Sequence, residues 1–168
     1  NRLSASLRYA QLRDIRDAEG RPQDQIFDRS FGLHYRLIDE TGHAPVVAIG
    51  VNDFIGTGIY AGEYLVATKS LTPQISATLG LGWGRLASFG GFANPLGGAL
   101  RDRPQTQIGA GGAIAGNTLF HGDAALFGGL RYQIRDDLAL LAEYSSDAHP
   151  AENGGRFIHR SPVNIGFI

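Results

Sequence analysis

The sequence contains no cysteine, no methionine and no long hydrophobic run. Without cysteine, both a disulfide framework and a thiolate metal site are excluded within its 168 residues. No stretch approaches the roughly 18 consecutive apolar residues that a membrane-spanning helix needs, although strands that cross a membrane remain possible. The net charge of −1 offers no positive field for a polyanion, so we expect no nucleic-acid partner.

The two ends lack the features of native termini. The sequence does not begin with methionine and has no signal peptide, and an alternating pattern that begins at Val163 is still running at Ile168. A strand cut within its pattern would leave backbone groups unpaired. We therefore expect residues 1–168 to be one section of a longer protein.

Strict alternation between Gln74 and Gly84 is the most informative pattern present. Ile75, Leu79 and Trp83 fall on one parity, whereas polar residues and glycine fall on the other. A period of two indicates a strand whose two faces meet different surroundings. Eleven residues is long for a globular strand but suits a tilted strand that crosses a bilayer.

Similar alternation recurs along the chain, and no stretch of comparable length shows a helical stripe. The pattern predicts further strands within residues 3–9, 31–37, 47–52, 58–69, 126–134, 138–145 and 163–168. Short connections at Asp39–His43, Ser70–Pro73 and Asp136–Asp137 alternate with longer ones such as Asp14–Phe27 and Asp147–Arg160. The fold class expected is all-β: an antiparallel up-and-down β-barrel of the outer-membrane type, or an open part of one, with about eight strands.

Residues 87–122 interrupt this order. A full strand at Thr106–Gly116 would invert the sequence of long and short connections. Glycine pairs, Asn94-Pro95 and Arg103-Pro104 instead favour one large loop insertion over residues 87–122. We expect that loop, with the strand at residues 106–116 as the alternative.

The apolar parity predicts a belt of side chains in contact with lipid. Aromatic side chains near the strand ends agree with this, because tyrosine and tryptophan favour the membrane interface. A soluble barrel with ordinary strand aromatics is the alternative interpretation. The residues expected in the belt are Tyr64, Ile75, Leu79, Leu81, Trp83, Tyr132 and Tyr144.

Charged residues are expected on the opposite, lumen-facing side. An arginine or lysine that faces lipid near the midplane costs about 2–4 kcal/mol, which favours the interior for these groups. They could form a ladder of salt bridges that holds a narrow barrel closed, or a polar surface that contacts a glycan. The residues are Glu63, Lys69, Arg85, Arg131 and Glu143.

No catalytic or metal-binding arrangement emerges. Ser30 and His34 would lie on one strand face but too far apart for a dyad, and His43, His121, His149 and His159 fall in predicted loops. The glycines at 109–112 suggest a dinucleotide loop, but no helical pattern follows them. We expect no cofactor, no metal site and no enzymatic activity.

Seven segments together resemble the YjbH family of Gram-negative outer-membrane proteins, which is associated with exopolysaccharide and capsule production. They occur in family order at Asp28–Phe31, Asp53–Gly58, Gly62–Lys69, Gly80–Leu86, Ala125–Gly129, Glu143–Asp147 and Ser161–Gly166. The resemblance implies an outer-membrane β-barrel lipoprotein, longer than this chain. The lipidated cysteine of such proteins is absent here, so anchoring is not carried over.

The expected role is therefore support of polysaccharide biosynthesis or export in the outer membrane of a Gram-negative bacterium. Expected partners are outer-membrane lipid, the exopolysaccharide and other polysaccharide-export proteins. A structural barrel that docks partners without transport is the alternative, because eight closed strands leave room only for their own side chains. An outer-membrane lipase or protease would need a catalytic cluster that the sequence lacks.

Overall fold

Eight strands form one antiparallel sheet in the computed structural model, with the spatial order β1 to β8 identical to the sequence order. The structure describes residues 1–16, 22–56, 58–104, 116–150, 152 and 157–168. β1 and β8 form the two edges, and no pairing joins them in the described ranges, so the sheet is open. Its strands are β1 (Leu3–Arg16), β2 (Pro22–Ile38), β3 (Val46–Ile55), β4 (Gly62–Ser70), β5 (Ile75–Gly84), β6 (Ala124–Arg135), β7 (Leu138–Tyr144) and β8 (Val163–Phe167).

The predicted all-β class and the predicted number of strands are confirmed, but the prediction for the connection between the first two strands is wrong. β1 and β2 pair as far as Arg16 and Pro22, so most of the loop expected at Asp14–Phe27 is strand. β2 pairs with β3 only from Phe31 onward, so the far ends of β1 and β2 continue as a two-stranded ribbon. Polar residues break the alternation there, and backbone pairing with the neighbouring strand maintains the extended structure.

Between β5 and β6 the described residues hold three short 3-10 helices. These are η1 (Arg85–Ala87), η2 (Gly98–Leu100) and η3 (Gly116–Thr118). Residues 105–115 lie outside the described part of the chain, so neither the alternative strand nor the glycine motif at 109–112 is tested.

Cross-strand register assigns every strand residue to one of two faces, because directly opposed residues project to the same side. Leu79 opposes Ala67 and Gly128, and Leu130 opposes Ala77 and Ala142. Serine, threonine, glycine and charged residues such as Arg131 and Glu143 occupy most of the alternate positions, together with Tyr64, Phe127 and Leu141. The sheet therefore has one apolar face and one face of small and polar residues.

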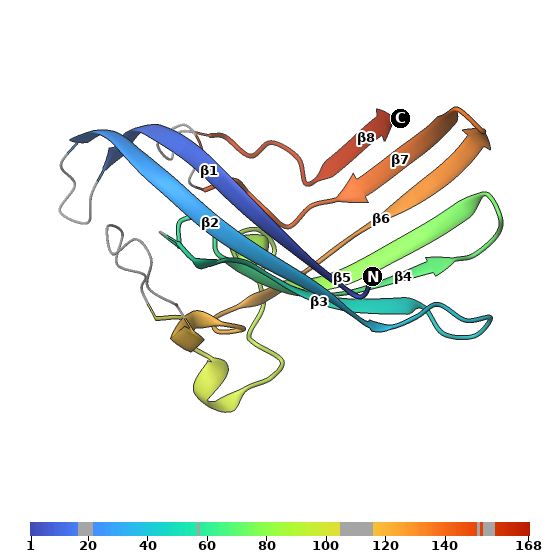
Figure 1. Ribbon diagram of the computed structural model, residues 1–168, viewed down its shortest axis with the longest axis horizontal. Coiled ribbons are helices and arrows are strands. Elements are labelled where there is room, and N and C mark those ends of the chain that lie inside the picture. Colours follow the sequence, from blue (N-terminus) through green and yellow to red (C-terminus); the bar gives the residue numbers. More distant parts are fainter. Residues whose placement is uncertain (17–21, 57, 105–115, 151, 153–156) are drawn as a thin grey trace.

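The sheet curves toward its polar face. Ser6 in β1 and Asp147, which follows β7, line the same hollow although five strands lie between β1 and β7. Figure 1 shows the same curvature: β1–β2 and β6–β8 rise on one side of β3–β5, and the residues around η2 lie below. We call the polar side the concave face and the apolar side the convex face.

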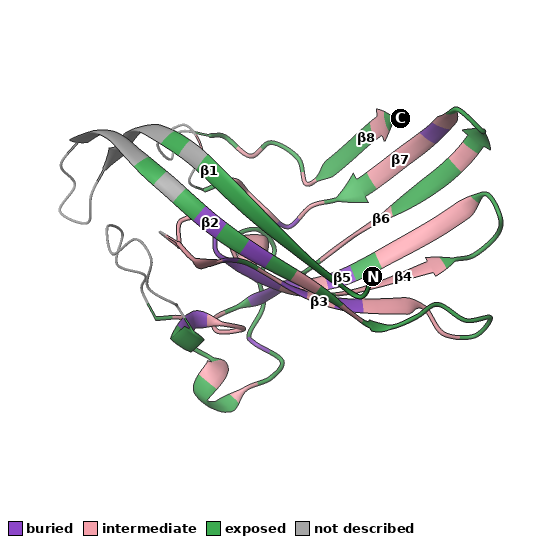
Figure 2. Cartoon of the chain, in the orientation of Figure 1, coloured by how far each residue is buried: buried purple, intermediate pink, exposed green. Residues whose placement is uncertain are grey.

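Large apolar side chains lie mostly on the outside of this molecule. Leu7, Leu79 and Ile165 are 68%, 61% and 72% exposed, and all three project from the convex face. The buried apolar residues are mainly alanines, and Figure 2 shows no strand that is buried along its whole length. A water-soluble domain would cover such a face, because contiguous exposed apolar surface favours association.

Two aromatic rings fill the middle of the concave face. The Tyr64 ring lies over Gly50 and the Phe127 ring over Gly80, so closely that a Cβ at either glycine would collide with the ring. The two rings meet edge to face with centroids 6.4 Å apart, and the Tyr64 hydroxyl lies 3.0 Å from His34 Nδ1. This aromatic row joins β2, β4 and β6 across the polar side.

Candidate functional site

The side chain of Leu86 separates a larger from a smaller hollow on the concave face. Leu86 lines both hollows. It packs so closely over Gly82 that a Cβ added at Gly82 would collide with the Cβ of Leu86. Small residues on β4 and β5 therefore make room for a side chain that η1 supplies. Together the two hollows form the candidate functional site.

The larger hollow, which we call the β5–β7 groove, has a volume of about 440 Å³. Its apolar wall includes Phe127 and Leu141, and its polar groups include the hydroxyls of Ser76 and Thr78. The Thr78 hydroxyl is 2.9 Å from that of Thr68 on the adjacent strand. The volume lies within the range of pockets that bind small molecules.

Arg131 and Glu143 are the two charged residues that line this groove. Arg131 opposes Ser76 and Leu141, while Glu143 opposes Gly129. The two charges are therefore diagonal neighbours, with about 7–8 Å between their backbone positions. Asn164 Nδ2 donates to Glu143 Oε1 at 3.3 Å, and no ion pair joins Arg131 to Glu143.

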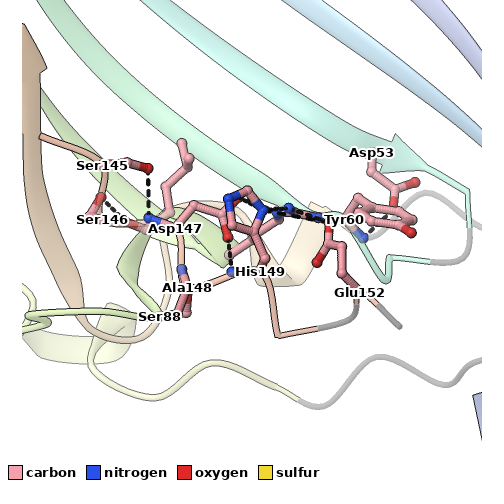
Figure 3. Close-up of polar contacts among 11 residues, drawn as sticks. Asp53, Tyr60, Ser88, Ser145, Ser146, Asp147, Ala148, His149 and Glu152 are labelled. Carbon is pink, nitrogen blue, oxygen red and sulfur yellow. Dashed lines mark hydrogen bonds and ion pairs between the residues drawn. The ribbon is translucent and has the colours of Figure 1, made fainter. Parts of the chain in front are cut away.

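The smaller hollow, the Arg85 pocket, has a volume of about 310 Å³ and lies where β1–β4 meet the loop after β7. Arg85 Nε donates to Asp147, and its Nη2 donates to Glu152 at 2.6 Å and to His149 Nδ1 at 2.7 Å. Because arginine can only donate, His149 Nδ1 accepts and its ring proton lies on Nε2. In Figure 3 the His149 side chain lies between Asp147 and Tyr60, and Glu152 lies beside Tyr60.

Two opposing effects act on the pKa of Arg85. Burial alone would lower this pKa, but hydrogen bonds to Asp147 and Glu152 raise it above its ordinary value. Arg85 therefore stays charged, and its charge is balanced inside the protein. The pocket is held together by this network.

Tyr60 lies between two arginines in the same pocket. The Arg8 guanidinium carbon is 3.8 Å from the centre of the Tyr60 ring, and that of Arg85 is 5.0 Å away. The backbone N–H of Tyr60 donates to Asp53 Oδ2 at 2.9 Å, which holds the turn between β3 and β4. Cation–π contacts of this kind fix the positions of both arginines.

The structure brings three of the five predicted inward charges to the concave side and contradicts the prediction for the other two. Arg85, Arg131 and Glu143 line the two hollows. Glu63 opposes Trp83, and Lys69 opposes Ala77, so both project from the convex face. Whether the concave side encloses a lumen stays a prediction.

Lys69 lies on the convex face close to the end of β4. Its ammonium group reaches the turn between β2 and β3, where it donates to Thr41 O and lies 3.4 Å from Glu40 Oε1. A long side chain can keep its stem along an apolar surface while its charge reaches a polar edge. Glu40 lies in the same turn. Its carboxylate accepts a hydrogen bond from the backbone N–H of Ser70, and this bond lowers the pKa of Glu40.

Glu63 is 1% exposed and is covered by the segment between β5 and β6. Arg103 donates to both of its carboxylate oxygens at 2.8 and 2.9 Å, and the N–H of Phe120 donates at 3.1 Å. Trp83 lies beside it, 3% exposed, with Phe120 edge-on at 5.2 Å. Trp83 projects from the same face as Leu79 and Leu81, but Phe120 covers it and excludes it from the exposed surface.

The register also corrects the position of Tyr64. It opposes Gly82 and therefore lies on the concave face, opposite to the predicted lipid belt. The other predicted belt residues share the convex face, where Leu79 is widely exposed and no helix or sheet of the described chain covers it. Those residues are Ile75, Leu79, Leu81, Tyr132 and Tyr144.

Sequence reasoning missed the partners of the buried charges. Arg103, Asp147 and Glu152 all lie in loops, and so does His149, whose predicted loop position gave no indication of its contact with Arg85. A loop that folds back over a sheet leaves no periodic signal.

Within the described ranges, no three histidine or carboxylate side chains are grouped to hold a metal ion. None of the helices described there is long and apolar enough to cross a membrane.

Comparison with known proteins adds to this geometry. The YjbH family model, described as "Exopolysaccharide biosynthesis protein YbjH", matches residues 1–168. This chain belongs to the YjbH family. One relative, from Escherichia coli strain K12, is named "Uncharacterized lipoprotein YjbH" and is 38% identical over 99% of this chain. The chain spans 24% of the length of that relative. No solved structure matches the chain.

Proposed function

We propose that residues 1–168 form part of the wall of an outer-membrane β-barrel that supports exopolysaccharide biosynthesis or export in a Gram-negative bacterium. In this proposal the convex face contacts lipid and the concave face meets the polymer. The role is non-enzymatic, uses no cofactor and involves no nucleic acid. Other polysaccharide-export proteins are the proposed protein partners.

The separation of chemistry between the two faces carries this proposal. Exposed large side chains such as Leu79 and Leu130 cover the convex face, whereas Arg131, Glu143 and hydroxyl groups line the hollows of the concave face. Transmembrane β-strands alternate in this way, with apolar residues outward and polar residues inward. Membership of an exopolysaccharide biosynthesis family supports a polymer as the molecule that meets the polar face.

A bulky residue in the groove tests the proposal. Ser76→Trp fills the β5–β7 groove, while Ala77→Trp adds the same ring one position away on the opposite face. In cells that carry the intact protein, we expect Ser76→Trp to reduce polymer at the cell surface and Ala77→Trp to leave it unchanged. Surface polysaccharide is quantified, and heat-modifiable migration on a denaturing gel confirms that both variants fold.

If cells with the folded Ser76→Trp variant carried a normal amount of polymer at their surface, this result would contradict a polymer path over the concave face. If deletion of the protein still abolished polymer, a scaffold that docks other proteins would be the better description. One observation favours that second role: Tyr64 and Phe127 fill the middle of the concave face, which resembles a packed interior.

A further inference from the structure

Arg131 differs from the partly buried Arg85 and Arg103, because it has no partner among the residues that the structure describes. Arg85 and Arg103 each make charged hydrogen bonds, whereas no ion pair or hydrogen bond engages the Arg131 side chain in the part of the chain that the structure describes. It is an exposed residue that lines the β5–β7 groove. Its planar guanidinium can therefore present two parallel N–H groups to a ligand.

The surroundings of Arg131 restrict the ligand. Phe127 and Leu141 provide an apolar wall, while Ser76 and Thr78 provide hydroxyl groups on the other side. The C–H face of a pyranose ring suits the face of an aromatic ring, whose π electrons carry partial negative charge. Hydroxyls at the edge of the sugar suit the serine and threonine side chains.

Glu143 completes this set from the adjacent strand. One of its oxygens accepts from Asn164 at 3.3 Å, so the carboxylate is held in the groove. An ionised carboxylate only accepts hydrogen bonds, so it recognises sugar hydroxyls and repels a second carboxylate. Its diagonal position relative to Arg131 lets the two residues address opposite edges of one ring.

We propose that the β5–β7 groove binds an acidic sugar unit, a hexuronate, of the polymer. The sugar carboxylate pairs with Arg131, and a sugar hydroxyl donates to Glu143. This inference rests on the proposed function and adds the charge of the substrate to it. A matched neutral sugar lacks the group that Arg131 recognises, so it binds more weakly.

Titration calorimetry on the intact protein in detergent micelles tests this preference. The probes are a trimer of galacturonic acid and the trimer of galactose with the same linkages, its neutral counterpart. A bidentate charged pair predicts a preference for the acidic trimer of about tenfold or more. Arg131→Gln should remove the preference, and Arg131→Lys should retain only part of it because the ammonium group binds as a point charge.

Arg135→Gln provides the matched control. Arg135 lies on the same strand, its side chain is 68% exposed, and it does not line the groove. We expect this variant to keep the wild-type preference. Equal binding of both trimers by the wild type, or an unchanged preference in folded Arg131→Gln, overturns the acidic-sugar inference and leaves the proposed function intact. Failure of the wild type to bind either trimer also overturns this inference. The proposed function is overturned by a different result, which is a normal amount of surface polymer with the folded Ser76→Trp variant.

Discussion

Replacing Glu63 with glutamine is expected to lower the free energy of unfolding by about 3–5 kcal/mol. Glu63 is 1% exposed and Arg103 binds both of its oxygens, so the change leaves a largely buried guanidinium without its counter-charge. The N–H of Phe120 also loses a charged acceptor. Urea unfolding of the intact protein measures the effect, with Asp137→Asn as an exposed control that should change stability by less than about 0.5 kcal/mol.

The double variant Glu63→Met with Arg103→Met separates the ion pair from the shape of the site. When both charges are replaced by apolar side chains of similar length, neither desolvated group remains, so most of the lost stability should return. A glutamine variant as stable as the wild type would show that the pair does not hold the β5–β6 segment onto the sheet.

An arginine at position 79 should cost about 2–4 kcal/mol in a bilayer. Leu79 is 61% exposed on the convex face, so a water-facing site would accept arginine with little change in stability. Ser76→Arg places the same charge on the concave face of the same strand and should cost less. Folding equilibria in lipid vesicles compare the two variants.

Equal and small costs for Leu79→Arg and Ser76→Arg would contradict lipid contact on the convex face. A large cost for both would indicate that position 76 is also enclosed in an apolar environment. Only a larger cost for Leu79→Arg than for Ser76→Arg agrees with a convex face that contacts lipid and a concave face that does not.

The fold was predictable largely because β5 alternates without exception. Ile75, Leu79 and Leu81 identify the convex face from their spacing alone, and the register extends that assignment across the sheet. β4 shows where the reasoning fails. Tyr64 and Val66 share one parity while Leu65 and Lys69 share the other, so neither set is clearly apolar and only pairing with β5 decides.

The candidate site was predictable only in part, for a physical reason. Arg131 and Glu143 lie on strands, where parity locates a side chain. Arg85 finds its partners more than 60 residues away, in a loop that follows β7. Arg103 reaches Glu63 in a similar way across 40 residues. Such contacts depend on how the loops fold back over the sheet, which the spacing of residues along the sequence does not indicate.

Spin labels offer the most direct test of the two-faced sheet, since the sequence has no cysteine that would react elsewhere within it. Labels at Leu79→Cys and Ile165→Cys probe the convex face, and a label at Ser76→Cys probes the concave face, all in the intact protein in lipid vesicles. Molecular oxygen, which concentrates in hydrocarbon, should relax the first two labels, and a water-soluble nickel chelate should relax the third. Strong relaxation of the labels at 79 and 165 by the nickel chelate would contradict the account.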